Sequence, residues 1–287
     1  MKTIIYSIIA ILFFTTFIKG FSGKANSGNS IRIQANDKAA SEAQLTQSAQ
    51  IISTRLKEFS SHEFTVSVIP EKKQIQIDLG PNLDLKAIGN LVIAKGTLAL
   101  YETYDRKSLM ELLHGDTQLY AYLNISNSTD YGAAIGSASI AGDMNVKRYL
   151  NTLALDQKCK FLWDSKAGDS DEYLYALKIN GERGPILAKS EIENVRCSQS
   201  DSSKINGIEI RIKEPAIHLW AEATKRSIGH AIAIVMDNHV LAAPIVRSVI
   251  TGGKCMISGN FSQTEMKSIA SLGNNGELPI NFTIVKF

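Results

Sequence analysis

The sequence is poor in the residues that most often build metal and redox sites. It has three cysteines and five histidines in 287 residues, and Cys159, Cys197 and Cys255 are far apart with no C-x-x-C pair. Zinc sites and thioredoxin-like motifs need cysteines at short spacing, so neither is indicated. An odd number leaves at least one cysteine unpaired, and the sequence allows either one disulfide or three small buried thiols.

The best-known nucleophile and phosphate-binding motifs are missing as well. The chain contains no G-x-S-x-G elbow, no P-loop and no G-x-G-x-x-G turn. His218 and His230 flank one predicted helix without a cysteine or carboxylate at ligand spacing, His239 follows a turn, and His62 and His114 stand alone. We therefore expect no enzymatic activity, no metal and no cofactor, and we interpret each histidine as structural or solvated.

Charge of one sign is not concentrated anywhere in the chain. Thirty-one basic and 28 acidic residues are spread along it and leave a net charge of +3. Proteins that bind nucleic acid usually gather Lys and Arg in one patch, so we expect no nucleic-acid partner.

The chain has a single long apolar run, at its N-terminus. Lys2 precedes the run Ile4 to Ile18, and Lys19 and the small-residue stretch Gly20-Phe21-Ser22 follow it. A helix of this length spans about 23 Å, which is short of the ~30 Å hydrocarbon core, and the stretch offers a small-x-small cleavage site. We expect residues 1–22 to be a signal peptide that directs the chain to the periplasm. The alternative is an uncleaved anchor of the inner membrane through residues 4–18.

After a Gly/Ser/Asn-rich linker at residues 23–29, the hydrophobic spacing alternates between the periods of strands and helices. A strand at Ile31 and Ile33 precedes a helix with an apolar stripe from Leu45 to Phe59. Next come a hairpin over residues 64–79, a helix after Asp84 and a strand over residues 97–104. The order β-α-β-β-α-β is the ferredoxin-like pattern, and we place it at residues 30–104.

The middle of the chain, from Asp105 to about Lys204, is less regular, and clear patterns resume at Ile208. Four features follow in order: a helix opened by Glu214-Pro215, a doubly buried strand at 231–236, a turn at Asp237-Asn238, and a helix with the capping box Ser262/Glu265. A final alternating stretch from Leu278 to Phe287 predicts a strand that needs a sheet edge to pair with.

Several of these segments resemble one known family. Five of them occur in the family's order: Ile228 to Asn238, Ala242 to Val246, Ile250 to Gly253, Ile257 to Phe261 and Gly276 to Pro279. Together they resemble the end of the first periplasmic domain of SecD and of fused SecDF proteins. Tyr101 to Tyr104, Leu174 to Leu177 and Trp220-Ala221 fit the same family, so the resemblance covers most of the chain after residue 22, with the middle matched in patches.

The resemblance implies an α+β fold made of a ferredoxin-like base and an inserted, mobile α+β head. The base would comprise residues 30–104 with residues 276–287 returning to it as a strand, and the head would comprise residues 105–275. The implied hinge residues are Tyr104, Asp105, Asn274, Asn275 and Gly276. The turns of the family motif are candidate partner contacts: Asp237, Asn238, Thr251, Gly252, Gly253, Gly259 and Asn260.

The resemblance also implies a role in Sec-dependent protein export. The expected partners are a translocating preprotein or other unfolded polypeptide, components of the Sec translocon, and the membrane if the N-terminal segment stays uncleaved. Family members continue into membrane helices that couple the proton gradient to movement, and no second run of that length occurs here, so we expect no proton-driven motor. The alternative is a free-standing envelope module that kept the fold and binds another partner or a ligand.

Overall fold

The computed structural model describes most of the chain after the N-terminal segment. The described residues are 29–125, 133–139, 143–155, 157–164, 171–179, 184–199, 206–259 and 261–287. The expected signal peptide or anchor, and the linker up to residue 28, lie outside these residues.

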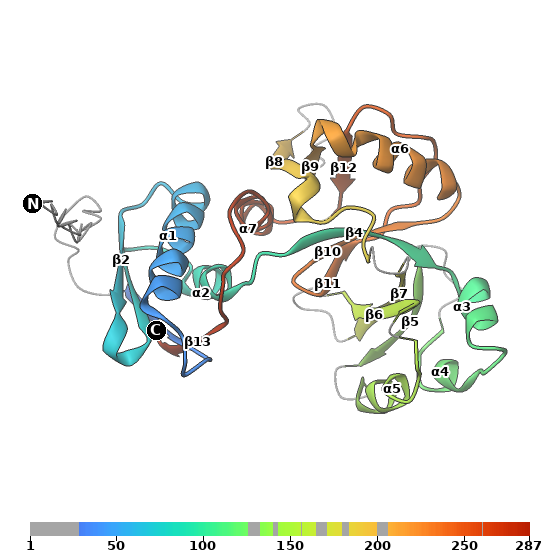
Figure 1. Cartoon of the computed structure of the whole chain (residues 1–287), viewed down its shortest axis with the longest axis horizontal. Coiled ribbons are helices and arrows are strands. Elements are labelled where there is room, and N and C mark those ends of the chain that lie inside the picture. The colour runs from blue at the N-terminus through green and yellow to red at the C-terminus, as the bar shows by residue number, and fades with distance from the viewer. Residues whose placement is uncertain are drawn as a thin grey trace, which may run out of the picture.

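The first part of the chain and its last strand form one layered unit, which we call the base (Figure 1). Its elements are β1 (Asn29–Ala35), α1 (Glu42–Phe59), β2 (Phe64–Ile69), the 3-10 turn η1 (Pro70–Lys72), β3 (Gln74–Leu79), α2 (Leu85–Ile93) and β13 (Phe282–Lys286). The strands form an antiparallel sheet in the order β13-β1-β3-β2. Ile31, Ile33, Ile75 and Ile77 are fully buried, and because side chains alternate along a strand they share the face that α1 and α2 cover.

The C-terminal strand pairs with the N-terminal sheet, as the sequence predicted. Ala35 lies opposite Phe282 and Arg32 opposite Lys286. The prediction that residues 97–104 add the fourth strand of this sheet is wrong, because β13 holds that position. Strand β4 (Leu98–Tyr104) instead pairs with β10 (Ile232–Met236) over five residues. Strand β10 is paired on both edges, with β4 on one side and β11 (His239–Ala242) on the other, and all of its residues are buried.

Strand β4 therefore runs out of the base and into a second, central sheet. The order of that sheet is β11-β10-β4-β7-β5, and β6 also pairs with β7. The other strands are β5 (Ala134–Ser139), β6 (Cys159–Trp163), β7 (Asp171–Lys178) and β11 (His239–Ala242). Helices α3 (Arg106–Leu112), α4 (Gln118–Ala121) and α5 (Asp143–Leu150) lie beside β5, β6 and β7, and we call this group the lower lobe (Figure 1).

A third sheet and one helix form what we call the upper lobe. Its elements are the 3-10 turn η4 (Lys189–Glu191), β8 (Ile192–Gln199), β9 (Asn206–Ile212), η5 (Glu214–Ala216), α6 (Ile217–Arg226) and β12 (Lys254–Ser258), with the strand order β12-β9-β8. Helix α7 (Gln263–Asn274) packs against β8 on one side and against α1 and α2 of the base on the other. It begins with the predicted capping box, in which Ser262 and Glu265 bond each other's backbone N–H.

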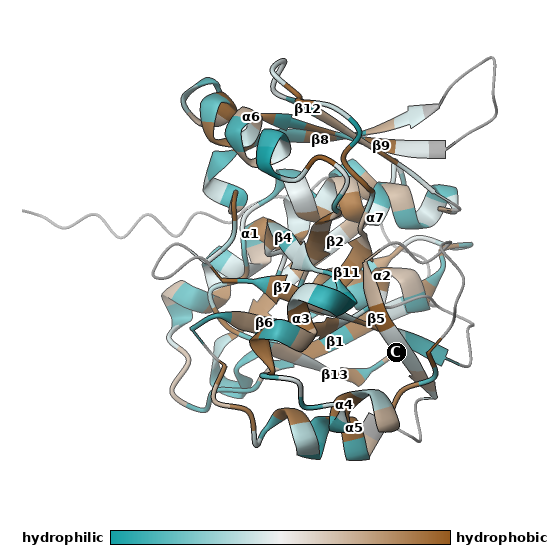
Figure 2. Ribbon diagram, turned by 90° about the vertical axis from the view of Figure 1, so that its right-hand side faces the viewer, coloured by the Kyte–Doolittle hydropathy of each residue, from teal (hydrophilic) through white to brown (hydrophobic). Residues whose placement is uncertain are grey.

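The hydrophobic core does not divide at the boundary between base and upper lobe. One cluster of buried side chains contains Ile33 and Leu56 of the base together with Ile210, Trp220 and Met266. The lower lobe has a separate core around Leu109, Ile135 and Leu174. Figure 2 shows brown, apolar residues on the interior strands and teal, polar residues on outer helices such as α5 and α6. The base and the upper lobe are thus one packed body, with an α+β fold of antiparallel sheets.

None of the helices in the described ranges combines the length and the hydrophobicity that a bilayer span requires.

Candidate functional site

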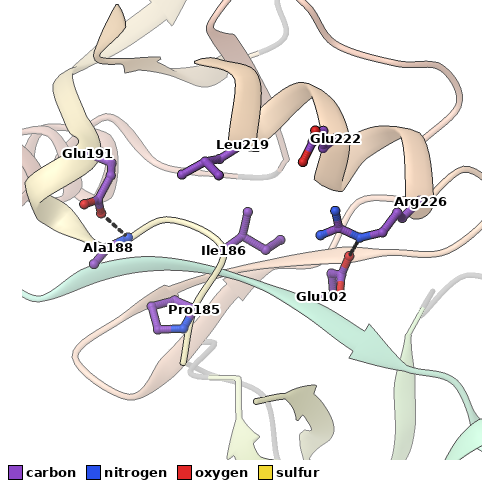
Figure 3. A pocket seen from close by; sticks show the side chains of 8 residues that line it. All are labelled: Glu102, Pro185, Ile186, Ala188, Glu191, Leu219, Glu222 and Arg226. Carbon is purple, nitrogen blue, oxygen red and sulfur yellow. Dashed lines mark hydrogen bonds and ion pairs between the residues drawn. The ribbon is translucent and has the colours of Figure 1, made fainter. Parts of the chain in front are cut away.

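A groove opens to solvent between helix α6 and strand β4 (Figure 3). Its volume is about 670 Å³. The lining residues come from three segments far apart in the sequence: Glu102, Pro185, Ile186, Ala188, Glu191, Leu219, Glu222 and Arg226.

One face of α6 forms a wall of the groove. Leu219, Glu222 and Arg226 are three and four residues apart, so they follow one another along the same side of the helix. The opposite face packs into the core, where Trp220 and Ala223 are buried. The amphipathic pattern of α6 therefore fixes which side chains face the groove.

The segment before η4 forms the other wall by adding to the edge of β4. The N–H of Leu100 donates to the carbonyl of Leu187 (2.8 Å), and the N–H of Ile186 donates to the carbonyl of Leu100 (2.7 Å). Since neighbouring residues of an extended chain point to opposite sides, Leu187 is fully buried and Ile186 points into the groove toward Leu219 (Figure 3).

Three carboxylates and one guanidinium line the groove, and they are not equally engaged. Arg226 Nε donates to Glu102 Oε1 at 3.1 Å, with the side chain of Glu102 11% exposed and that of Arg226 55% exposed. Both oxygens of Glu191 accept hydrogen bonds at the turn η4, from the N–H of Ala188 (2.8 Å) and from Ser190 Oγ (2.7 Å). Glu222 is exposed and forms no hydrogen bond or ion pair with the described part of the chain.

A second polar cluster lies where the chain passes between the base and the rest of the molecule. We call this place, made of residues 94–97 and 272–278, the joint. Arg55 of α1 is fully buried there, and its guanidinium donates to the carbonyls of Leu91 (3.3 Å), Ala94 (2.6 Å), Lys95 (2.9 Å) and Gly276 (2.9 Å). Burial lowers the pKa of Arg55 to about 10.

Two side chains from the head also bind the joint. Lys189 Nζ donates to the carbonyls of Leu272 (2.6 Å) and Asn275, and burial lowers the pKa of this amine to about 8. The carboxylate of Asp237 accepts from the N–H groups of Gly96 (3.0 Å) and Thr97 (2.7 Å) and from the Thr97 hydroxyl (2.9 Å). Both crossings of the chain are therefore held by groups from the base and from the head.

The structure places the expected hinge residues in two separate regions. Asn274 and Asn275 lie at the joint, where both side-chain amides donate to the carboxylate of Glu58. Tyr104 and Asp105 lie at the far end of β4, where the chain enters the lower lobe (Figure 1). The chain re-enters the base at Asn274–Gly276, and it leaves the base at residues 94–97. It does not leave the base at Tyr104-Asp105, as the sequence had suggested, because β4 belongs to the central sheet.

Tyr104 and Asp105 contact residues of the lower lobe and one residue, His230, that lies just before β10. The ammonium of Lys178 lies 5.4 Å from the ring centroid of Tyr104. Asp105 caps α3 by accepting from the N–H of Ser108 (2.7 Å), and it lies 3.4 Å from Nδ1 of His230. The hydrogen bonds from Ser108 are the main cause that lowers the pKa of Asp105.

The turns of the family motif are not brought together into one surface. Asp237 and Asn238 both have positive φ (48° and 64°) in the turn between β10 and β11, and the Asn238 side chain accepts from Lys160 Nζ (2.7 Å). The turn at Thr251, Gly252 and Gly253 leads into β12 of the upper lobe.

At two positions of these turns, neighbouring side chains leave little room for a Cβ atom, which favours glycine. Gly253 has φ +63°, and a Cβ there would lie 2.7 Å from the side chain of Ile217. A Cβ on Gly259 would lie 3.0 Å from the ring of Phe261. Asn260 lies outside the described residues.

No three His, Cys, Asp or Glu side chains of the described ranges converge in a way that could hold a metal ion.

Comparison with known proteins places the larger part of the groove in a recognised domain. Residues 169–280 match the family described as SecDF, P1 head subdomain. This segment contains every groove residue except Glu102.

The curated relatives are subunits of the protein translocase. A segment of 107 residues is 29% identical to SecD of Leptotrichia buccalis and covers 37% of this chain and 26% of that protein. A segment of 105 residues is 35% identical to SecD of Sebaldella termitidis and covers 36% and 25% of the two proteins. The chain thus matches about a quarter of the length of these relatives.

Solved structures share the fold over most of the chain. One, described as a membrane component SecDF that enhances protein export, has a TM-score of 0.52 at 17% identity and covers 90% of this chain and 99% of that chain. Another, SecDF in a super-membrane-facing form, has a TM-score of 0.54 at 17% identity and covers 90% of this chain and 29% of that chain.

Proposed function

We propose that this chain, which is related at the level of one domain to the protein-export subunits SecD and SecDF, is an extracytoplasmic accessory protein of export. It holds an extended segment of a translocating or newly exported polypeptide in the groove between α6 and β4, next to the translocon. It acts by binding and catalyses no reaction, and it carries no proton-driven motor. The observation that supports this proposal is an open groove with mixed apolar and charged walls inside the segment that matches the SecDF P1 head.

The chemistry of the groove suits an unfolded polypeptide. Ile186 and Leu219 point into it from opposite walls and offer an apolar contact for one side chain of an extended segment (Figure 3). Beyond the end of α6, Ile228 and Ile245 are each 48% exposed on adjacent segments. Exposed apolar side chains that neighbour one another are typical of interaction surfaces.

Site-specific photocrosslinking tests this proposal. A photoreactive phenylalanine analogue at Leu219, which is 36% exposed in the groove, is compared with the same analogue at Tyr122, which is 38% exposed in the lower lobe. During export of a preprotein, we expect an adduct with the preprotein from position 219 and none from position 122.

Two outcomes would contradict the proposal. Equal labelling from both positions would show that contact is unspecific. A single adduct of position 219 with an unrelated envelope protein, and none with the preprotein, would favour a free-standing envelope binding module instead.

A further inference from the structure

The charges of the groove differ in sign from the charge of the whole chain. Glu102, Glu191 and Glu222 against Arg226 give the groove a net charge of −2 at neutral pH (one positive and three negative groups), whereas the chain as a whole carries +3. Because the groove is negative on a positive protein, its occupant should bring positive charge with it.

The carboxylates differ in their availability to an occupant. Glu102 already has the Nε of Arg226 at 3.1 Å, and Glu191 accepts two hydrogen bonds from its own turn. Arg226 lies one turn after Glu222, a spacing that favours an ion pair, yet its guanidinium is directed to Glu102 (Figure 3). Glu222 therefore lines the groove with a carboxylate that no group in the described part of the chain engages.

The apolar contact and this carboxylate have a fixed spacing. Leu219 and Glu222 are one turn apart on α6, which corresponds to roughly 5 Å along the helix axis. In an extended polypeptide, side chains two residues apart point to the same side, about 6.5 Å from one another. A flexible Lys or Arg side chain easily covers the difference between these two distances.

We propose that the groove selects extended segments in which an apolar residue and a Lys or Arg stand two positions apart, with the apolar side chain between Ile186 and Leu219 and the cation paired with Glu222. This inference rests on the proposed function and assigns the specificity of that site to one residue, Glu222. Segments with an acidic residue at the second position are disfavoured by the same carboxylate.

Peptide binding to the full chain tests the inference. The probes are three fluorescein-labelled ten-residue peptides of alternating Val and Thr with one Leu, which carry Lys, Gln or Glu two positions after the Leu. By fluorescence anisotropy at low salt, we expect the Lys peptide to bind about threefold more tightly than the Gln peptide and about tenfold more tightly than the Glu peptide. Because the pair is partly exposed, 0.5 M salt should reduce both ratios.

Two variants make the test specific to the residue. Glu222→Gln should remove most of the difference between the three affinities, while Glu111→Gln, at an exposed position on α3, should leave the preference unchanged. Equal binding of the three peptides by the unchanged chain would overturn the charge selection. The proposed function would survive that result if Leu219→Asp still abolished binding.

If none of the peptides binds, or if Leu219→Asp has no effect on their binding, the proposed function and this inference fail together.

Discussion

Arg55 is the residue on which most of the joint depends. Its guanidinium hydrogen-bonds four backbone carbonyls that lie at the end of α2 and at Gly276, and it is fully buried. A buried carbonyl that loses its donor is costly, because no water replaces the lost bond. The side chain therefore joins two segments that are far apart in the sequence, since Lys95 and Gly276 are separated by 181 residues.

Replacing Arg55 with methionine should lower the free energy of unfolding by about 3 kcal/mol, since several carbonyls lose their donor together. Urea denaturation measures this change. The control is Arg247→Met, at an exposed position without a hydrogen bond or ion pair to the described part of the chain, and it should change stability by less than about 0.5 kcal/mol. Equal stability of the two variants would contradict the role of Arg55.

Gly96 allows a second test at the same place. It has φ +84°, and a Cβ would lie 2.3 Å from Nη2 of Arg55. Gly115 has nearly the same φ, +83°, with no atom within 4 Å of the Cβ position. Gly115→Ala should cost only the backbone strain of about 1 kcal/mol, while Gly96→Ala adds a steric clash and should cost roughly 3 kcal/mol. Thermal unfolding of the two variants separates the two effects, and equal losses would show that the guanidinium moves aside freely.

Among the elements, strand β13 has the greatest consequence for the fold. It completes the base sheet through β1 and contributes the buried Phe282 to the core, whereas Phe287, just after the strand, is 58% exposed. The strand forms one edge of the base sheet, and it contacts α2, which covers one face of that sheet.

Phe282→Ala should destabilise the protein by about 3 to 4 kcal/mol, because it removes a buried ring and leaves a cavity. Phe287→Ala serves as the control and should cost less than about 1 kcal/mol, since most of its ring is already in solvent. Urea midpoints of both variants check the difference. A small loss at Phe282 would mean that β13 contributes little to the base.

How much of these elements could be predicted from the sequence depends on the range of the interactions. The capping box of Ser262, the turn at Asp237-Asn238 and the last strand are set by local patterns, and all three are present. The partner of residues 97–104 was predicted wrongly, because two strands of similar pattern compete for one sheet edge and spacing does not choose between them.

The groove could not be predicted from the sequence at all. Glu102, Ile186 and Leu219 come from segments that are brought together only when residues 185–188 add to the edge of β4. Of these segments, the sequence predicted the strand that carries Glu102 and the helix that carries Leu219. The part around Ile186 lies in the middle of the chain, where the spacing of hydrophobic residues shows neither a clear helical nor a clear strand period.

At the scale of the whole molecule, the core and the joint connect the base firmly to the upper lobe. The shared core cluster continues from Ile33 to Trp220 without a break, and Lys189 holds both crossings from the side of the head. The amine of Lys189 has its pKa lowered to about 8 by burial and then by the charge of Arg55, while Glu277, Asp237 and Glu58 act in the opposite direction.

This lowered pKa predicts a pH dependence of stability. Between about pH 8 and the ordinary lysine pKa near 10.4, the unfolded chain keeps the proton on Lys189 that the folded chain has lost. The unfolded state then binds more protons, so this group's contribution to the free energy of unfolding rises with pH in that range. Since Lys189 is only partly buried, we expect a rise of roughly 1 kcal/mol between pH 7 and pH 9.5.

Urea unfolding is measured at the two pH values, with Lys189→Met as the reference. The comparison separates the contribution of Lys189 from that of the tyrosines and cysteines, which both proteins share. Relative to the variant, the unchanged protein should gain stability at the higher pH. A constant difference between the two proteins would show that the amine is not affected by its burial.

The pairing of β1 with β13 also determines the order in which the protein is completed. Arg32 pairs with Lys286, 254 residues further along the sequence, and closing so long a loop is slow compared with forming local contacts. During synthesis, the edge of β1 in the first sheet stays unpaired until residues 282–286 arrive. We expect the lower lobe, with its own core, to be structured before the base becomes resistant to proteolysis.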